Sequence, residues 1–179
     1  FTYENLGSGG APIPTRSFTK HEEGIWIGYR FFDTFHRQVA YPFGYGLSYT
    51  TFEYHGMTVK RNGNKLVVSV NVKNTGSVAG KEVAQVYVAA PKGRLEKPAK
   101  ELKAFAKTRV LKPGESQTLQ MVLEVRDLAS YDETNNQWLA DAGTYTFFVG
   151  SNIEDIKGKS TINLPQYTEK TSAALAMKK

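Results

Sequence analysis

The sequence predicts a mainly β protein, built around an antiparallel β-sandwich of about seven strands. Two observations support this prediction. From Met57 onward, short segments of alternating apolar and polar residues are separated by turn residues, which is typical of all-β sandwiches. Before that point, glycine, proline and aromatic residues dominate instead. The change of pattern predicts a domain boundary between residues 51 and 52.

The region before the boundary has three parts. Residues 1–20 contain several glycines and prolines and are expected to form an extended loop. In residues 22–35, EEGIWIGYRFFDTF, apolar side chains fall on both faces of an alternating pattern, which indicates a segment buried between layers. Residues 41–54, YPFGYGLSYTTFEY, place aromatic rings around glycines and a proline, which indicates a packed turn rather than a linker.

The sandwich is expected to begin with a hairpin. Residues 52–60 read as the first strand, and Asn62-Gly63-Asn64 supplies a tight turn because asparagine and glycine tolerate positive φ. Residues 66–72 alternate strictly between apolar and other residues, which makes them the clearest strand in the chain. A third strand, EVAQVYVAAP, is rich in β formers and is ended by Pro91.

The second half of the sandwich is predicted from the same patterns. Residues 101–111 and 119–125 give two strands, separated by a Lys-Pro-Gly-Glu turn. Residues 126–142 are polar and read as one long connection, which is normal in a Greek-key sandwich. Two further strands follow at residues 145–149 and 160–164.

The strand count and spacing define the fold class and the domains. About seven strands in a little over 100 residues match the immunoglobulin-like size class. The chain has no cysteine pair and no core tryptophan signature of an antibody domain, which favours a fibronectin-III-like sandwich. The sandwich is placed at residues 52–167, after a leading region at 1–51 and before a terminal tail at 168–179.

Composition narrows the function classes. The net charge of +6 could indicate a protein that binds nucleic acid. The basic residues are scattered among acidic ones, however, so no nucleic-acid partner is expected. The absence of cysteine excludes disulfides, thiol catalysis and thiolate metal sites, and it fits either the cytoplasm or the periplasm, with the periplasm slightly favoured. No window is apolar enough for a membrane helix. With no initiator methionine and no signal peptide, the chain reads as cut from a longer protein.

Several strings resemble the family 3 glycoside hydrolases. EEGIWIGYRFFDTF and VAYPFGYGLSYTTFEY look like the segment that joins the α/β domain of that family to its C-terminal domain. VSVNVKNTGSVAGKEVAQVYVAAP, KPAKELKAFAKTRVLKPGESQTLQMVL and DAGTYTFFVGSN are similar to the family as well. Together the strings cover most of positions 22–152, and the eight-residue FGYGLSYT is the most specific of them.

The resemblance implies a larger enzyme with a (β/α) barrel, an α/β sandwich and this β-sandwich, which removes β-linked glucosyl or xylosyl units with retention of configuration. Residues 1–51 are then the end of the α/β domain and a linker. An aspartate of the barrel attacks the sugar and a glutamate protonates the leaving oxygen, and neither motif occurs in this chain. The chain alone is therefore expected to be inactive and to act as a scaffold.

The same resemblance sets the expected partners. These are the barrel and α/β domains of the same enzyme, and through them a β-linked oligosaccharide. A homodimer of the complete enzyme is a further candidate assembly. Neither a cofactor nor a metal ion is expected in this chain.

The aromatic run is interpreted as an interdomain seal. A sugar-stacking platform is the alternative, but alternation with glycine and proline favours packing between the α/β domain and the sandwich. The sequence assigns this packing role to Tyr41, Phe43, Tyr45, Tyr49 and Phe52.

A second group of residues is placed near the substrate. Glu22 and Glu23 are adjacent, so on an extended chain their carboxylates point to opposite faces and cannot flank one scissile bond. A solvated and a hydrogen-bonded carboxylate at a domain contact is the preferred interpretation. In the alternative, residues 21–26 line an outer sugar subsite, with His21 beside the two glutamates and Trp26 stacking on a sugar ring.

Other polar residues are given structural roles. Arg30 is expected to pair with Asp33 or with a neighbouring carboxylate. The histidines lack the close spacing of common metal-binding pairs. The long connection contains four acidic residues whose spacing is not that of an EF-hand, so no calcium site is predicted. They are Asp127, Asp132, Glu133 and Asp141.

A rival interpretation is a free-standing carbohydrate-binding or adhesion module of the same sandwich class. The two differ in the length of the gene, because only the hydrolase needs several hundred further residues and a nucleophile motif. Titration with gluco- and xylo-oligosaccharides separates the two kinds of module.

Overall fold

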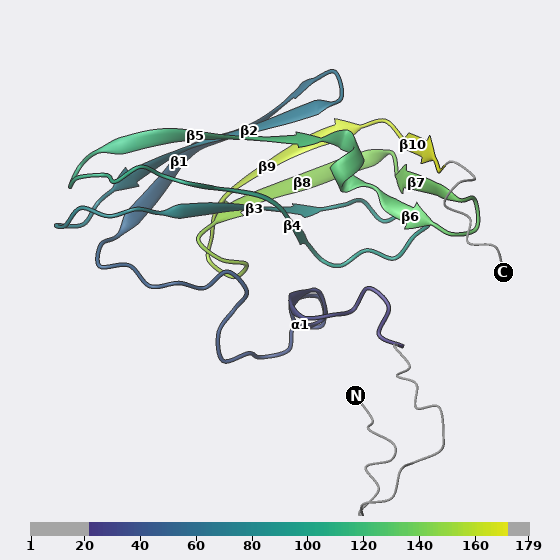
Figure 1. The fold of residues 1–179 in the computed structure, drawn as a ribbon, viewed down its shortest axis with the longest axis horizontal. Coiled ribbons are helices and arrows are strands. Elements are labelled where there is room, and N and C mark those ends of the chain that lie inside the picture. Colours follow the sequence, from purple (N-terminus) through teal and green to yellow (C-terminus); the bar gives the residue numbers. More distant parts are fainter. Residues whose placement is uncertain (1–21, 172–179) are drawn as a thin grey trace, which may run out of the picture.

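The protein folds as two packed antiparallel sheets with a third, smaller sheet at one end (Figure 1). The computed structural model describes residues 22–171. The first sheet has the order β1-β2-β5 and contains β1 (Phe52–Asn62), β2 (Lys65–Asn74) and β5 (Ser116–Glu124). The second has the order β4-β3-β8-β9 and contains β3 (Val83–Ala89), β4 (Glu101–Lys107), β8 (Gly143–Gly150) and β9 (Ile156–Leu164).

The core lies between these two sheets and is built by residues two apart along each strand. In β2, Leu66, Val68, Val70 and Val72 are all at most 1% exposed, and the residues between them are half-buried. Alternate residues of β3, β5 and β8 meet them from the facing strands. Since successive side chains of a strand point to opposite faces, this pattern gives one core face per sheet. The predicted mainly β, fibronectin-III-like sandwich is confirmed.

The first hairpin forms as the sequence indicates. Asn62 of β1 pairs with Lys65 of β2, so Gly63 and Asn64 alone make the turn. Gly63 has φ +60°, a conformation that glycine adopts without the steric cost of a side chain.

Strand β3 departs from simple alternation because both of its faces are covered. Ala84, Val86 and Val88 enter the core, while Gln85 and Tyr87 on the other face are buried as well. The cover over that face is the segment of residues 22–51, here called the leader, which runs beneath the second sheet in Figure 1.

The leader contains a short helix rather than an extended segment. Helix α1 (Tyr29–Thr34) begins after Gly28, whose φ is +57°. The alternation in residues 22–35 therefore does not form a strand, and several of its apolar side chains are exposed within this chain. Across residues 22–171 no helix combines the length and apolar character that a membrane span requires.

The polar connection at residues 126–142 is more ordered than the sequence suggests. It contains the 3-10 turn η1 (Val125–Leu128) and the hairpin of β6 (Ser130–Asp132) and β7 (Gln137–Ala140). Strand β10 (Tyr167–Lys170) adds to β7 and completes the third sheet, in the order β10-β7-β6. The first residues of the predicted terminal tail, 168–170, thus lie in a strand.

Candidate interdomain joint

The leader is fastened to the outer face of β3 by two side chains, Gln85 and Tyr87. The Gln85 amide donates hydrogen bonds to the carbonyl oxygens of Gly44, at 3.0 Å, and Ser151, at 2.5 Å. The Tyr87 hydroxyl lies 2.6 Å from Gln85 Oε1 and 3.3 Å from the Phe43 carbonyl oxygen. Burial raises the pKa of Tyr87, so the hydroxyl keeps its proton and acts as a donor here.

The contact with Gln85 determines the backbone conformation of residues 43–46, FGYG. Gly44 has φ +84°, and a Cβ atom added there would overlap Gln85 Oε1. Only glycine fits such a close approach in that conformation. Phe43, the residue before it, stacks on Tyr29 with ring centroids 4.2 Å apart, and its carbonyl also accepts from the Ile153 amide at 3.0 Å.

Helix α1 is tied to β4 and to the residues just before β4. Arg30 Nε donates to Glu101 Oε1 at 2.8 Å, and Lys100 Nζ donates to Asp33 Oδ1 at 2.5 Å. Burial alone would raise the pKa of Glu101, but the Lys103 ammonium and the Arg30 guanidinium outweigh it and hold that pKa below its usual value. Arg30 thus pairs with a neighbouring carboxylate rather than with Asp33.

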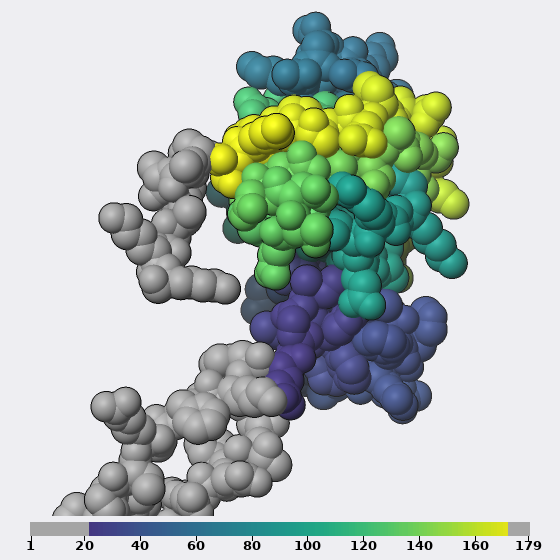
Figure 2. Space-filling view, turned by 90° about the vertical axis from the view of Figure 1, so that its right-hand side faces the viewer, coloured from purple at the N-terminus to yellow at the C-terminus, as the bar shows by residue number. Residues whose placement is uncertain are grey.

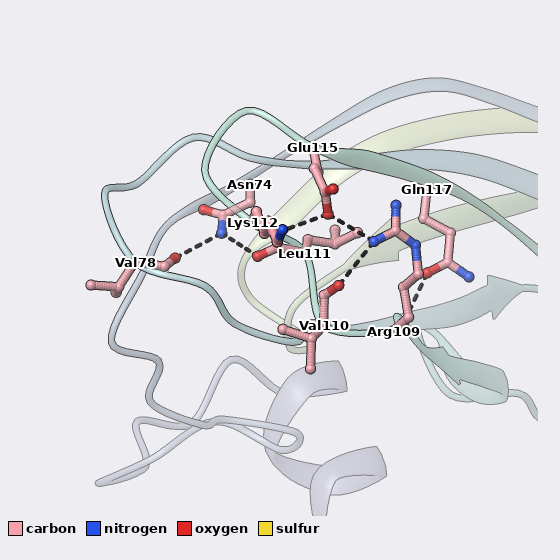
Figure 3. Close-up of polar contacts among 8 residues, drawn as sticks. All are labelled: Asn74, Val78, Arg109, Val110, Leu111, Lys112, Glu115 and Gln117. Carbon is pink, nitrogen blue, oxygen red and sulfur yellow. Dashed lines mark hydrogen bonds and ion pairs between the residues drawn. The ribbon is translucent and has the colours of Figure 1, made fainter.

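A further anchor holds the end of the leader. Asn74 is fully buried, and its side-chain oxygen accepts from the Thr50 hydroxyl at 2.7 Å. Its amide nitrogen donates to the carbonyls of Val78 and Leu111, both at 2.8 Å, and Figure 3 shows the side chain lying between them. One side chain therefore joins the leader to two turns of the sandwich.

Much of the surface that the leader exposes is apolar. Eleven of the sixteen exposed large apolar side chains among residues 22–171 belong to the leader, although it is a small part of the described chain. Figure 2 shows the leader, in purple and dark blue, as a lobe beside the sandwich. Large exposed apolar patches mark interaction surfaces. The exposed apolar residues of the leader, together called the leader face, are Ile25, Ile27, Phe31, Phe32, Phe35, Val39, Tyr41, Phe43, Tyr45, Leu47 and Tyr49.

Some of the predicted seal residues are exposed on the leader, and others pack within this chain. Tyr41, Tyr45 and Tyr49 are exposed on the leader face, and Tyr49 is fully exposed. Phe43 is 42% exposed and shares its ring between the leader face and Tyr29. Phe52 packs instead against the core of the sandwich.

The predicted substrate-proximal residues lie at the start of the leader. Glu22 is exposed and Glu23 is half-buried. Trp26 is half-buried, and its ring meets Phe35 edge-on with centroids 5.1 Å apart. This contact gives the tryptophan a packing role within the leader. His21 lies outside the described residues.

Two of the four acidic residues in residues 126–142 have separate structural roles. Asp127 Oδ2 accepts from the Glu124 amide at 2.8 Å. Asp132 is buried and accepts from Arg94 at 2.7 Å and from Asn135 at 2.8 Å. Within the described part of the chain, no group of three or more His, Asp or Glu side chains is arranged to hold a metal ion.

Gln85 and Tyr87 are the joint residues that sequence reasoning missed. The signal for them was present, because EVAQVYVAAP is a continuous run of β formers without the alternation of its neighbours. Such runs indicate strands that are covered on both faces. A glutamine in the middle of one needs buried hydrogen-bond partners, which the leader backbone supplies.

Known proteins match most of this chain. The fibronectin type III-like domain profile matches residues 82–153. A β-glucosidase from Ruminococcus albus is 45% identical over 164 residues, which are 87% of this chain and 17% of that enzyme. The structure of β-glucosidase 3B from Thermotoga neapolitana matches with a TM-score of 0.81 and 49% identity, over 84% of this chain and 21% of that one.

A GH3 β-glucosidase from Bifidobacterium adolescentis matches in the same way, with a TM-score of 0.77 and 41% identity over 80% of this chain and 21% of that one. The chain thus spans about a fifth of the length of the enzymes it matches.

Proposed function

Because this chain belongs to the C-terminal, fibronectin type III-like region of the family 3 glycoside hydrolases, we propose that it is the scaffold part of a retaining β-glycosidase. The complete enzyme removes terminal β-linked glucosyl or xylosyl residues from oligosaccharides, using two carboxyl groups about 5–5.5 Å apart. Both catalytic carboxyl groups lie outside this chain. The observation that carries the proposal is the leader, which is anchored to the sandwich and exposes many large apolar side chains.

Three carboxylates held in ion pairs support a scaffold rather than a catalytic centre. Asp33 is bound to Lys100, Glu101 to Arg30 and Asp132 to Arg94. A general acid of a glycosidase needs a raised pKa. The pKa of Asp132 is instead lowered, chiefly by the hydrogen bond from Asn135, and that of Glu101 is lowered by Lys103 and Arg30 against the effect of burial. These groups therefore suit ion pairs that fix a fold.

The partner of the leader face is the preceding α/β domain of the same enzyme. Exposed rings such as Tyr45 and Tyr49 would be buried in that contact, and the anchors on the other side would hold the two domains at a fixed angle. Glu22, Glu23 and Trp26, at the start of the leader, and His21 just before it are proposed to lie nearest the oligosaccharide that the other domains bind. A homodimer of the complete enzyme is a separate proposal, which light scattering of the complete enzyme decides.

The scaffold proposal is tested by Tyr49→Ala in the complete enzyme. Tyr49 is fully exposed in this chain, so any loss of stability must come from contacts with another part of the enzyme. Truncating a fully buried aromatic ring costs about 3–5 kcal/mol, and we expect a loss of that order in the unfolding free energy. Phe105→Ala, on the 69% exposed Phe105 of β4, is the matched control and should leave stability unchanged. An equal melting temperature for Tyr49→Ala and the parent enzyme would refute the contact.

A further inference from the structure

Residues 44–50 of the leader have the side-chain alternation of a β-strand. Gly44 approaches Gln85 too closely to carry a Cβ atom. The Thr50 hydroxyl donates to Asn74 at 2.7 Å, so both ends of this stretch face the sandwich. No residue from 45 to 50 is helical or has a positive φ, which fits an extended backbone. The odd-numbered residues between the two ends are exposed, and these are Tyr45, Leu47 and Tyr49.

The backbone of the same stretch is unpaired. From Gly46 to Tyr49, neither the amides nor the carbonyl oxygens form a hydrogen bond within residues 22–171. These four residues belong to none of the three sheets. An extended segment with free N–H and C=O groups offers another strand the same groups that the edge of a sheet does.

The sequence of this stretch does not protect it from pairing. Residues 38–52 contain no Asp, Glu, Lys or Arg, and residues 43–50 contain no proline. Natural edge strands that stay exposed usually carry charges or proline, which prevent pairing with other strands. A stretch that lacks both and exposes apolar side chains therefore fits a strand that is paired in the complete enzyme.

A strand satisfies this surface better than a helix does. A helix packed over the exposed side chains would bury the apolar groups, but it would leave the backbone donors and acceptors beneath it without partners. A strand laid alongside pairs with those backbone groups, and its own side chains can cover the apolar ones. The preceding α/β domain is a source of such a strand, because an open sheet has two edges.

We propose that residues 46–49 pair with an edge strand of the preceding domain and extend its sheet by one strand. The inference rests on the proposed scaffold function, which supplies the partner domain. The length of the relatives supports a partner within the same polypeptide, because this chain spans only 17% and 21% of two enzymes that it matches. The short stretch is long enough, since β6 in this fold is a strand of only three residues.

Amide hydrogen exchange in the complete enzyme, resolved by residue and corrected for intrinsic rates, tests the pairing. Successive amides of a strand point to opposite edges, so a partner on one edge protects every second amide. We expect exchange at least about tenfold slower at one alternate pair, either Gly46 and Ser48 or Leu47 and Tyr49, than at the other pair. Gly63, in the turn of the first hairpin, is the unprotected reference.

Other exchange patterns overturn the pairing but leave the scaffold standing. Four amides that exchange as fast as Gly63 would show that no strand is added. Four amides that are slowed equally would show that the stretch is covered without pairing along one edge. The scaffold proposal fails separately, if Tyr49→Ala leaves the melting temperature of the complete enzyme unchanged.

Proline variants test the same hydrogen bonds by removing their donors. Leu47→Pro and Ser48→Pro each delete one N–H group, and Leu47→Ala and Ser48→Ala are the matched controls that keep it. At the position whose amide is protected, we expect the proline variant to melt at a lower temperature than the alanine variant. At the neighbouring position the two should melt alike. A difference at both positions, or at neither, would contradict pairing along one edge.

Photo-crosslinking identifies the partner strand. A benzophenone amino acid replaces Leu47 in the complete enzyme, and the joined peptides are identified by mass spectrometry after irradiation. We expect a crosslink within one polypeptide, to a segment of the preceding domain that forms the edge of its sheet. A crosslink to a second copy of the enzyme, or to a helix, would overturn the proposed strand.

Discussion

Gly44 is the residue on which the shape of the joint most directly depends. Its φ of +84° and the overlap that a Cβ atom would have with Gln85 Oε1 both exclude a side chain. Gln85 cannot easily move away, because it is bonded to Gly44, Ser151 and Tyr87. The shape of the turn is thus a consequence of one buried amide.

We expect Gly44→Ala to destabilise the complete enzyme by about 1–3 kcal/mol, the usual cost of a strained backbone position. Gly46→Ala is the matched control in the same string, since a Cβ atom there would meet nothing within 4 Å. Thermal unfolding of both variants measures the difference. Equal melting temperatures for the two variants would contradict the role of Gly44.

Glu82, just before the start of β3, should make the stability depend on pH. Burial raises its pKa more than the hydrogen bond from the Val83 amide lowers it. Between its ordinary pKa of 4.5 and its raised value, the folded state binds more protons than the unfolded state. The contribution of Glu82 to the unfolding free energy therefore falls as the pH rises through this window.

Glu82→Gln removes that titration and keeps an oxygen that can accept from Val83. We expect the variant to gain stability relative to the parent as the pH is raised from about 4 to about 7, the range in which a raised carboxyl pKa acts. Melting temperatures of the complete enzyme at several pH values measure the trend. A variant that loses stability relative to the parent over this range would contradict it.

At the scale of elements, an ion pair that is largely shielded from solvent joins α1 to the residue just before β4. The Lys100 and Asp33 side chains are only 18% and 13% exposed. We expect Lys100→Met to lower the unfolding free energy by about 1–3 kcal/mol, because it leaves the Asp33 carboxylate buried without its donor.

Arg109→Met is the comparison for Lys100→Met, since it breaks the ion pair to Glu115 in which the arginine is 55% exposed. Exposed pairs of this kind contribute little to stability. Chemical denaturation of both variants gives the two losses. A larger loss for Arg109→Met would show that burial does not set the strength of these pairs.

The elements also show what the sequence could and could not predict. The alternation in residues 66–72 and the turn at Gly63 correctly predict the first hairpin, because those signals are local. The β6–β7 hairpin was missed because its strands are only three and four residues long. Its order depends on Asp132, whose partner Arg94 is distant in sequence. The pattern of apolar and polar residues in 126–142 cannot predict an ion pair with a residue that is distant in sequence.

At the scale of the whole molecule, the fold and the candidate joint differ in how far the sequence predicts them. The sandwich follows from patterns within single strands. The joint requires knowing that the leader covers β3, which depends on contacts such as the one between Gly44 and Gln85. Sequence reasoning correctly identified the aromatic character of the leader. It did not separate residues that face the sandwich core, such as Phe52, from those that face outward, such as Tyr49.

If the catalytic groups belong to the other domains and this chain is only a scaffold, changes to its own carboxylates should not affect catalysis in the complete enzyme. Glu22→Gln and Glu23→Gln should each leave kcat and its pH profile unchanged, because neither carboxylate is proposed to act on the glycosidic bond. Loss of a general acid or base lowers the rate by about 10²–10⁴-fold, so the distinction is easily measured. Trp26→Leu is the companion variant, and it too should leave kcat unchanged, since the ring packs on Phe35.

An effect of these variants that is confined to KM would place the start of the leader at the rim of the substrate site. A fall of about 100-fold or more in kcat for either glutamate variant would place part of the catalytic machinery in this chain and overturn its role as a scaffold.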